Sequence, residues 1–267
     1  MNNTGYSSIK IFCESKNANT SIASSRKIWT LQSPIVLGNT SNIKMLVSVE
    51  SCSIPLSFYM VNETNFNFSF NGAKGRIQEG NYNATKLTAV LNAVQREFIF
   101  SFNKDLSKFT MKGKLGLNKI DRIDNSIYSF LGLGSETSWM DDQSFIPTGV
   151  CNLVYTSGIY ISLNDMSNAN IDTGTSQQSS TCLLRIPISQ PVNTYLQHFN
   201  NVGFKTMLSG SVLNQLDISL LDDNRNLLQL SFNVPWVIVL RIDFEKTIVE
   251  FEEPTKINRL RTHLTKN

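Results

Sequence analysis

Histidine is scarce in this 267-residue chain, which has only two, His198 and His263. Imidazole is the usual side chain for acid-base chemistry near neutral pH and a common metal ligand, so few schemes of either kind are open. The chain also has no HExxH, GxSxG or P-loop motif, and Gly132-Leu133-Gly134 lacks the third glycine of a dinucleotide fingerprint. We therefore expect no enzyme activity and no cofactor, and we assign no catalytic, cofactor-binding or metal-binding residue. His198 is expected to be a hydrogen-bonded surface or half-buried residue, and His263 falls in the C-terminal tail.

Cysteine is also sparse, and no two cysteines are close enough in sequence to form a CxxC pair. Metal binding through these thiols is therefore not indicated. In a reducing compartment the default is four free thiols, most of them buried. The four residues are Cys13, Cys52, Cys151 and Cys182.

Long apolar runs are missing. The longest strongly apolar stretch, 234–240, is far shorter than the roughly 20 residues that cross a bilayer as a helix, so we expect no transmembrane segment. Residues 1–10 have no charged segment followed by an apolar one, so no signal peptide is expected. The 24 basic and 21 acidic residues are spread along the chain, with no basic block before the last dozen residues, which argues against a direct nucleic-acid role.

Uncharged polar residues are abundant instead. The chain has 29 Asn and 31 Ser, which favour turns and fit poorly inside helices, together with 16 Phe, which favour strands. This composition predicts short strands joined by many polar turns, and therefore a mainly β protein.

Alternation of apolar and polar residues predicts where the strands lie. The segment 65–70 has Phe at every second position, and the last predicted strand carries an apolar face from Trp236 to Phe244. Pro34 is expected to interrupt one strand. The predicted strands are 9–13, 27–37, 45–52, 65–70, 150–155, 159–163, 181–188, 215–220, 227–232 and 236–244.

The segment from 77 to about 133 has a different pattern. Apolar residues at 87, 90, 91, 94 and 98 form one stripe of a helix, predicted over 84–97 with Asn83 as its N-cap. A hairpin over 98–111 and a short helix or turn near 126–131 follow. Such a unit can cover one face of a small sheet with its helix.

Two acidic pairs lie in predicted loops, Asp141-Asp142 and Asp222-Asp223. Adjacent carboxylates can bind a hard cation such as calcium, but neither pair has the spacing of an EF-hand loop. The favoured interpretation is a turn that uses Asp to bond its own backbone.

Two further segments are polar. Residues 164–180 form a long predicted loop, of a length that is usually functional or mobile. The tail over 246–267 has too few apolar residues for a core of its own. It is either a solvated extension or an arm that orders on a neighbouring subunit.

Three stretches, taken in order, resemble a known family. The first reads Ile-Pro-Leu-Ser-Phe-Tyr-Met-Val-Asn at 54–62. The second reads Ile-Gln-Glu-Gly-Asn-Tyr at 77–82, and the helix and Ser-Phe-Leu-Gly-Leu at 129–133 follow it. The third is Leu-Leu-Arg-Ile-Pro-Ile at 183–188, then 216–227 and a closing strand over 236–242.

These motifs are similar to those of penton and minor capsid proteins of jelly-roll icosahedral double-stranded DNA viruses, which include large eukaryotic DNA viruses, virophages and Polinton-like elements. The resemblance covers about 27–245 and departs at Arg225-Asn226, where many relatives have glycine. It implies a mainly β fold, an antiparallel jelly-roll β-sandwich with a small inserted α+β subdomain. The implied division is 1–72 for the first part of the jelly roll with an N-terminal arm, 73–136 for the insert, 137–250 for the second part and 251–267 for the tail.

The same resemblance implies a structural capsid protein of the virion, assembled in the host cell. It would be a penton at the five-fold vertex, or a minor capsid or cement protein. The implied partners are four further copies of the chain in a homopentamer, the major capsid protein and other minor capsid proteins. The alternative is a virion spike or a β-sandwich that binds a glycan or receptor. A hydrolase is the least supported class, because two histidines offer no pairing of nucleophile and base.

Overall fold

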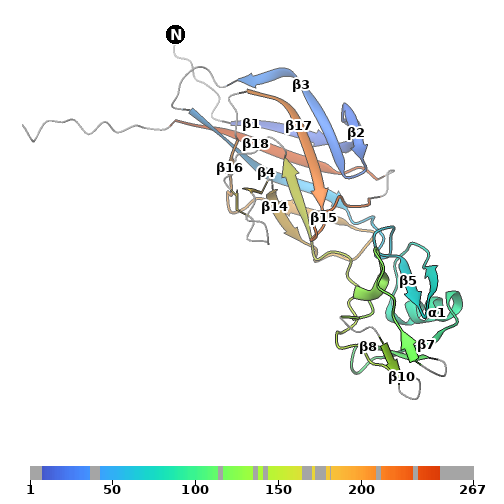
Figure 1. Cartoon of the computed structure of the whole chain (residues 1–267). Coiled ribbons are helices and arrows are strands. Elements are labelled where there is room, and N and C mark those ends of the chain that lie inside the picture. Colours follow the sequence, from blue (N-terminus) through green and yellow to red (C-terminus); the bar gives the residue numbers. More distant parts are fainter. Residues whose placement is uncertain are drawn as a thin grey trace, which may run out of the picture.

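The computed structural model describes residues 8–36, 43–113, 117–134, 138–140, 144–163, 170–171, 179–180, 182–208, 212–230 and 234–246. A two-sheet sandwich makes up the larger part of the molecule, and a smaller part projects from one of its ends (Figure 1).

The first sheet of the sandwich has the strand order β1-β18-β4-β15, with β16 also paired to β4. Its strands are β1 (Ser8–Glu14), β4 (Ile43–Pro55), β15 (Tyr195–Phe199), β16 (Thr206–Met207) and β18 (Val237–Lys246).

The second sheet has the order β14-β11-β17-β3-β2. Its strands are β2 (Thr20–Ala23), β3 (Arg26–Val36), β11 (Gly158–Leu163), β14 (Cys182–Pro187) and β17 (Val212–Leu221), and a short 3₁₀ turn, η1 (Ser15–Asn17), leads from the first sheet toward β2.

The order of these strands defines the fold. In chain order the eight main strands are β1, β3, β4, β11, β14, β15, β17 and β18. The first sheet contains the first, eighth, third and sixth of them, and the second sheet contains the second, seventh, fourth and fifth. All neighbours are antiparallel. This is the strand order of a jelly roll, with two interlocked Greek keys, so the predicted fold class is confirmed.

One apolar core fills the space between the two sheets. Alternate residues of β18 and the preceding Trp236 point into it, as the two-residue period predicts. The rings of Trp29 and Trp236 pack edge to face with their centroids 5.6 Å apart. The indole N–H of Trp236 donates to the backbone carbonyl of Ser24 at 3.0 Å, which satisfies a polar group inside the core.

The smaller part, called the insert below, lies between β4 and β11 in the chain (Figure 1). Its elements are β5 (Asn67–Phe70), β6 (Ala73–Arg76), α1 (Ala84–Val94), β7 (Phe98–Asn103), β8 (Lys108–Gly113), β9 (Leu117–Lys119), the 3₁₀ turn η2 (Ile127–Ser129) and β10 (Ser138–Met140). Two short strands of the following β11–β14 connection, β12 (Asn170–Ile171) and β13 (Ser179–Ser180), pair with each other.

Helix α1 confirms the predicted helix and its cap. The side chain of Asn83 accepts a hydrogen bond from the backbone N–H of Lys86, and Leu87 and Leu91 are buried. The helix ends at Val94, earlier than the predicted 97. The side chain of Gln95 accepts a hydrogen bond from the backbone N–H of Phe98 and donates one to its carbonyl, which ends the helix and directs the chain into β7. The predicted hairpin after the helix is present as β7 and β8.

The insert has its own core, whose buried residues run from Met60 to Leu133. Phe145 packs against it, so this core begins before and ends after the predicted 73–136 insert. The reason is that Phe68 and Phe70 of β5 are buried in this core, where Phe70 packs against Phe98 and Phe100 of β7. The division of the chain into separately folding domains stays a prediction.

Three strand predictions differ from the structure. Strand β3 continues through Pro34, which lies where the register with β17 shifts and β2 has ended, so the missing N–H costs little pairing. The segment 150–155 is not a strand, because its backbone amides do not pair with a neighbouring strand. The N–H of Cys151, for example, donates to the carbonyl of Ser107 in the turn between β7 and β8. The segment 227–230 is not one either: after the turn, Leu228 and Leu230 fold into the sandwich core.

Several sequence predictions fall outside the described residues. These are Asp141, Asp142, His263, Ser231, Phe232, most of the 164–180 loop, the N-terminal arm over 1–7 and the tail after Lys246.

Candidate functional site

The insert and the jelly roll meet at a junction formed by the segments 56–66 and 144–158. Tyr155 is part of both hydrophobic cores, and its ring lies 5.6 Å from that of Phe58. The backbone of Leu56 donates to Thr194 and accepts from Asn193, which ties the first segment to the sandwich. The junction is therefore a packed and hydrogen-bonded connection.

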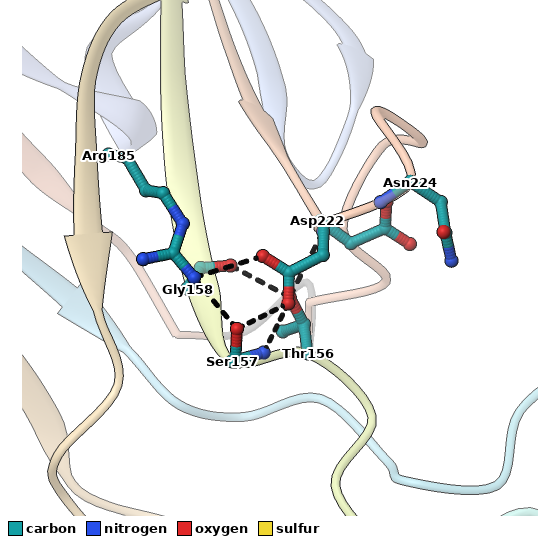
Figure 2. Close-up of polar contacts among 7 residues, drawn as sticks. Thr156, Ser157, Gly158, Arg185, Asp222 and Asn224 are labelled. Carbon is teal, nitrogen blue, oxygen red and sulfur yellow. Dashed lines mark hydrogen bonds and ion pairs between the residues drawn. The ribbon is translucent and has the colours of Figure 1, made fainter. Parts of the chain in front are cut away.

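A polar cluster holds the junction segment 144–158 to the sandwich (Figure 2). One carboxylate oxygen of Asp223 accepts from the backbone N–H of Ser157 at 2.5 Å and from its hydroxyl at 2.8 Å. Arg185 on β14 donates to the Ser157 hydroxyl at 2.7 Å and contacts the other Asp223 oxygen at 3.3 Å. The Thr156 hydroxyl accepts from the backbone of Asp223 and donates to Gly158. Three segments distant in sequence are joined in this way.

Asp223 is ionised in this cluster. Partial burial opposes the charge, but the hydrogen bonds from Ser157 and Thr156 and the contact with Arg185 outweigh it and lower the pKa of Asp223 below its ordinary value. The carboxylate is already occupied by its neighbours, so its role here is structural.

Asp222, the other member of the acidic pair, forms the turn that the sequence favoured. One of its oxygens accepts from the backbone N–H groups of Asn224 and Asn226, each at 2.8 Å. The other oxygen accepts from the Tyr155 hydroxyl at 3.3 Å. Among the described residues no group of three or more His, Cys, Asp or Glu is placed to hold a metal.

Two clefts border the junction, and both are lined by Val154 and Tyr155. The smaller, of about 300 Å³, is mostly apolar and includes Phe58 and Val192. The larger, of about 590 Å³ and called the polar cleft below, is lined mainly by amide and hydroxyl side chains. Its walls come from both parts of the molecule, so the cleft exists only because the insert sits where it does.

The outer face of the first sheet carries exposed aromatic side chains at both of its edges. The pairing registers place Phe12 of β1, Val239 of β18, Ser51 of β4 and Phe199 of β15 in one row across the sheet. Phe12 is 68% exposed and Phe199 is 62% exposed. We call these four residues the outer row. Further exposed apolar residues near its Phe199 end are Tyr195, Val202, Phe204 and Met207.

Charged groups next to the outer row pair with one another. Lys10 contacts Glu50 at 2.7 Å, while Asp243 contacts Arg241 at 2.9 Å and Lys205 at 3.0 Å. Burial opposes the charge on Asp243, but these two cations outweigh it and lower its pKa. The ion pairs leave the exposed aromatic ends of the outer row as its prominent apolar features.

The other residues singled out by sequence lie apart from the junction. His198 is half-buried in β15, and burial lowers its pKa. Cys13 and Cys52 are buried, and burial raises the pKa of each to about 12, so neither is a thiolate at neutral pH. Cys151 and Cys182 are half-buried, and neither forms a disulfide in the part of the chain that the structure describes. Gly132 has φ +75°, and a Cβ there would lie 2.4 Å from the carbonyl oxygen of Gly149, so this glycine serves close backbone packing.

Sequence reasoning found the Asp222-Asp223 turn but missed its partners and the polar cleft. Ser157 and Arg185 are 66 and 38 positions away from Asp223, and no local pattern links them. Only the jelly-roll order, which brings β11 and β14 beside the turn after β17, could have indicated this meeting.

No family model matches this sequence, and no curated protein matches it. Among solved structures, the crystal structure of the mavirus penton protein is similar over 89% of this chain and 99% of that chain, with 12% sequence identity and a TM-score of 0.44. In the part of the chain that the structure describes, no helix has the length and apolar character of a membrane span.

Proposed function

We propose that this chain is a structural, non-enzymatic subunit of an icosahedral capsid of a double-stranded DNA virus. Its place would be the five-fold vertex, as a penton, or a minor capsid position beside the major capsid protein. Jelly rolls also occur in lectins and enzymes, so the fold alone does not select this role. The support comes from the order of the sequence motifs and from the surface of the first sheet.

The outer row carries the proposal. Large exposed aromatic side chains suit a contact with another protein surface, because aromatic residues are enriched where protein surfaces meet. Here two exposed phenylalanines lie at opposite edges of one sheet, on the edge strands β1 and β15. A contact between the Phe12 edge of one copy and the Phe199 edge of the next uses two different patches, so it is heterologous.

Heterologous contacts repeat around an axis. They close into a ring when the rotation from one copy to the next is a whole fraction of a full turn. Five copies related in this way would form a homopentamer, as the penton hypothesis requires. The rim of such a ring would meet the major capsid protein and other minor capsid proteins. The protein would then reside in the virion after assembly in the host cell.

Electron microscopy of the purified protein tests this function. We expect ring-shaped particles with five-fold symmetry in which the insert projects from each subunit. Particles of single copies at every concentration would contradict the penton role. Rings of another symmetry would exclude the vertex but leave an assembly role.

A further inference from the structure

The polar cleft is built from two walls that belong to different parts of the molecule. Asn224, Asn226 and Gln229 come from the sandwich wall, and Asn125 and Ser129 come from the insert wall. The ring of Tyr155 lies between them, with Phe130 on the insert side. We propose that this cleft binds a neutral carbohydrate.

Six side-chain amides line the cleft, and those of Asn65 and Asn152 are engaged by the backbone of Met60, Asn62 and Val154. The other four are free for a ligand. Those of Asn125, Asn224, Asn226 and Gln229 are exposed and make no hydrogen bond to any described residue. Asn224 directs its amide away from the Asp223 cluster (Figure 2). Each amide offers both a donor and an acceptor, which matches the hydroxyl groups of a sugar, since each hydroxyl also donates and accepts.

The charges of the cleft exclude other ligand classes. No Lys or Arg is among the described residues that line it, so nothing there would neutralise a phosphate, sulfate or carboxylate ligand. Its one carboxylate, Asp222, is buried and already accepts hydrogen bonds from two backbone amides and Tyr155. A cation would therefore find no free acidic ligand. A neutral ligand with many hydroxyls suits the cleft.

Size and apolar surface agree with this class. A volume of about 590 Å³ lies within the range of small-ligand sites. Tyr155 is half-buried and Phe130 is 5% exposed, so each ring offers an edge against which the C–H groups of a sugar can pack. The ligand would touch both walls, so binding would depend on the orientation of the insert that the Asp223 cluster holds.

A glycan array of neutral, sialylated and sulfated oligosaccharides, probed with the purified full chain, tests the proposal. We expect binding to neutral glycans only. The double variant Asn224→Ala, Asn226→Ala should weaken it about tenfold or more, because two hydrogen-bonding side chains are lost. Both backbone N–H groups remain to cap Asp222, so this variant should fold. Asn125 is left unchanged, because its φ of 51° would strain alanine.

Two further variants complete the test. Ser129→Trp should abolish binding by filling the cleft from the insert wall. Asn201→Ala makes one Asn-to-Ala change on an exposed loop residue outside the cleft and should bind normally. No binding to any neutral glycan, binding restricted to acidic glycans, or binding that survives both cleft changes would overturn the proposal. Ring formation is measured separately, so failure here leaves the capsid role standing.

Discussion

Asp223 connects three segments through a single carboxylate, and its removal should loosen the junction. In Asp223→Asn the charge is lost, and with it the ion pair to Arg185. Because the group is partly exposed, we expect a loss of only about 1 kcal/mol of unfolding free energy at pH 7. Denaturant titration of the wild type and the variant measures this difference.

The pH dependence of that loss follows from the lowered pKa of Asp223. A carboxyl group whose pKa is depressed by folding stabilises the fold above its unfolded pKa, and this stabilisation is lost as pH falls through the folded pKa. The stability advantage of the wild type over Asp223→Asn should therefore be full at pH 7 and shrink as the pH falls through the lowered pKa of Asp223. A difference that stays constant as the pH falls would show that the charge is not responsible.

Helix α1 can be weakened as an element without touching the jelly roll. Its cap, Asn83, bonds the backbone N–H of Lys86 at 2.8 Å, and Asn83→Ala should cost about 1 kcal/mol. Asn83→Asp keeps an oxygen acceptor and is the matched control. Hydrogen exchange should accelerate in α1 for the alanine variant only. Equal acceleration in β18 would mean that the two cores unfold together.

The regular elements were predictable from local pattern, and the exceptions have physical causes. The two-residue period identified β4, β11 and β18, and the stripe at Leu87 and Leu91 identified α1, because each buries one face. The segments 150–155 and 227–230 alternate or cluster apolar residues as strands do. These two segments are not strands, because their apolar side chains cover the ends of the hydrophobic cores and no neighbouring strand pairs with them along their length.

At the scale of the whole molecule, the presence of an insert was predictable but its extent was not. Limited proteolysis tests whether it folds as a domain. Because the junction segments 56–66 and 144–158 are packed in the folded protein, we expect cleavage there only when added denaturant opens the junction, and we expect it to leave a protected insert fragment. Simultaneous loss of all fragments would argue for one cooperative unit.

The outer row and the polar cleft could be found only from the structure. The sequence predicted a strand at Phe12 but none at Phe199, and only the structure shows β15 and the registers that place both residues at opposite ends of the outer row. The polar cleft likewise depends on how β17, η2 and Tyr155 meet. Residue type alone could not reveal either site, because Asn and Ser occur throughout the chain.

If the Phe12 edge of one copy contacts the Phe199 edge of the next, two single variants have a specific expected result. Phe12→Lys and Phe199→Lys should each stay folded, since both side chains face water, and each should fail to form rings because every contact would bury a charge. Ile99→Lys is the matched control, because Ile99 is also 68% exposed but lies on the insert; it should assemble normally.

Native mass spectrometry of the two edge variants, alone and mixed, tests the central claim most directly. Each variant alone should be a monomer of about 30.0 kDa. In the mixture, the intact Phe12 edge of one variant can meet the intact Phe199 edge of the other, and no second contact can form. We therefore expect heterodimers and nothing larger. Rings formed by either variant alone, or a mixture that stays monomeric while the wild type assembles, would contradict this expectation.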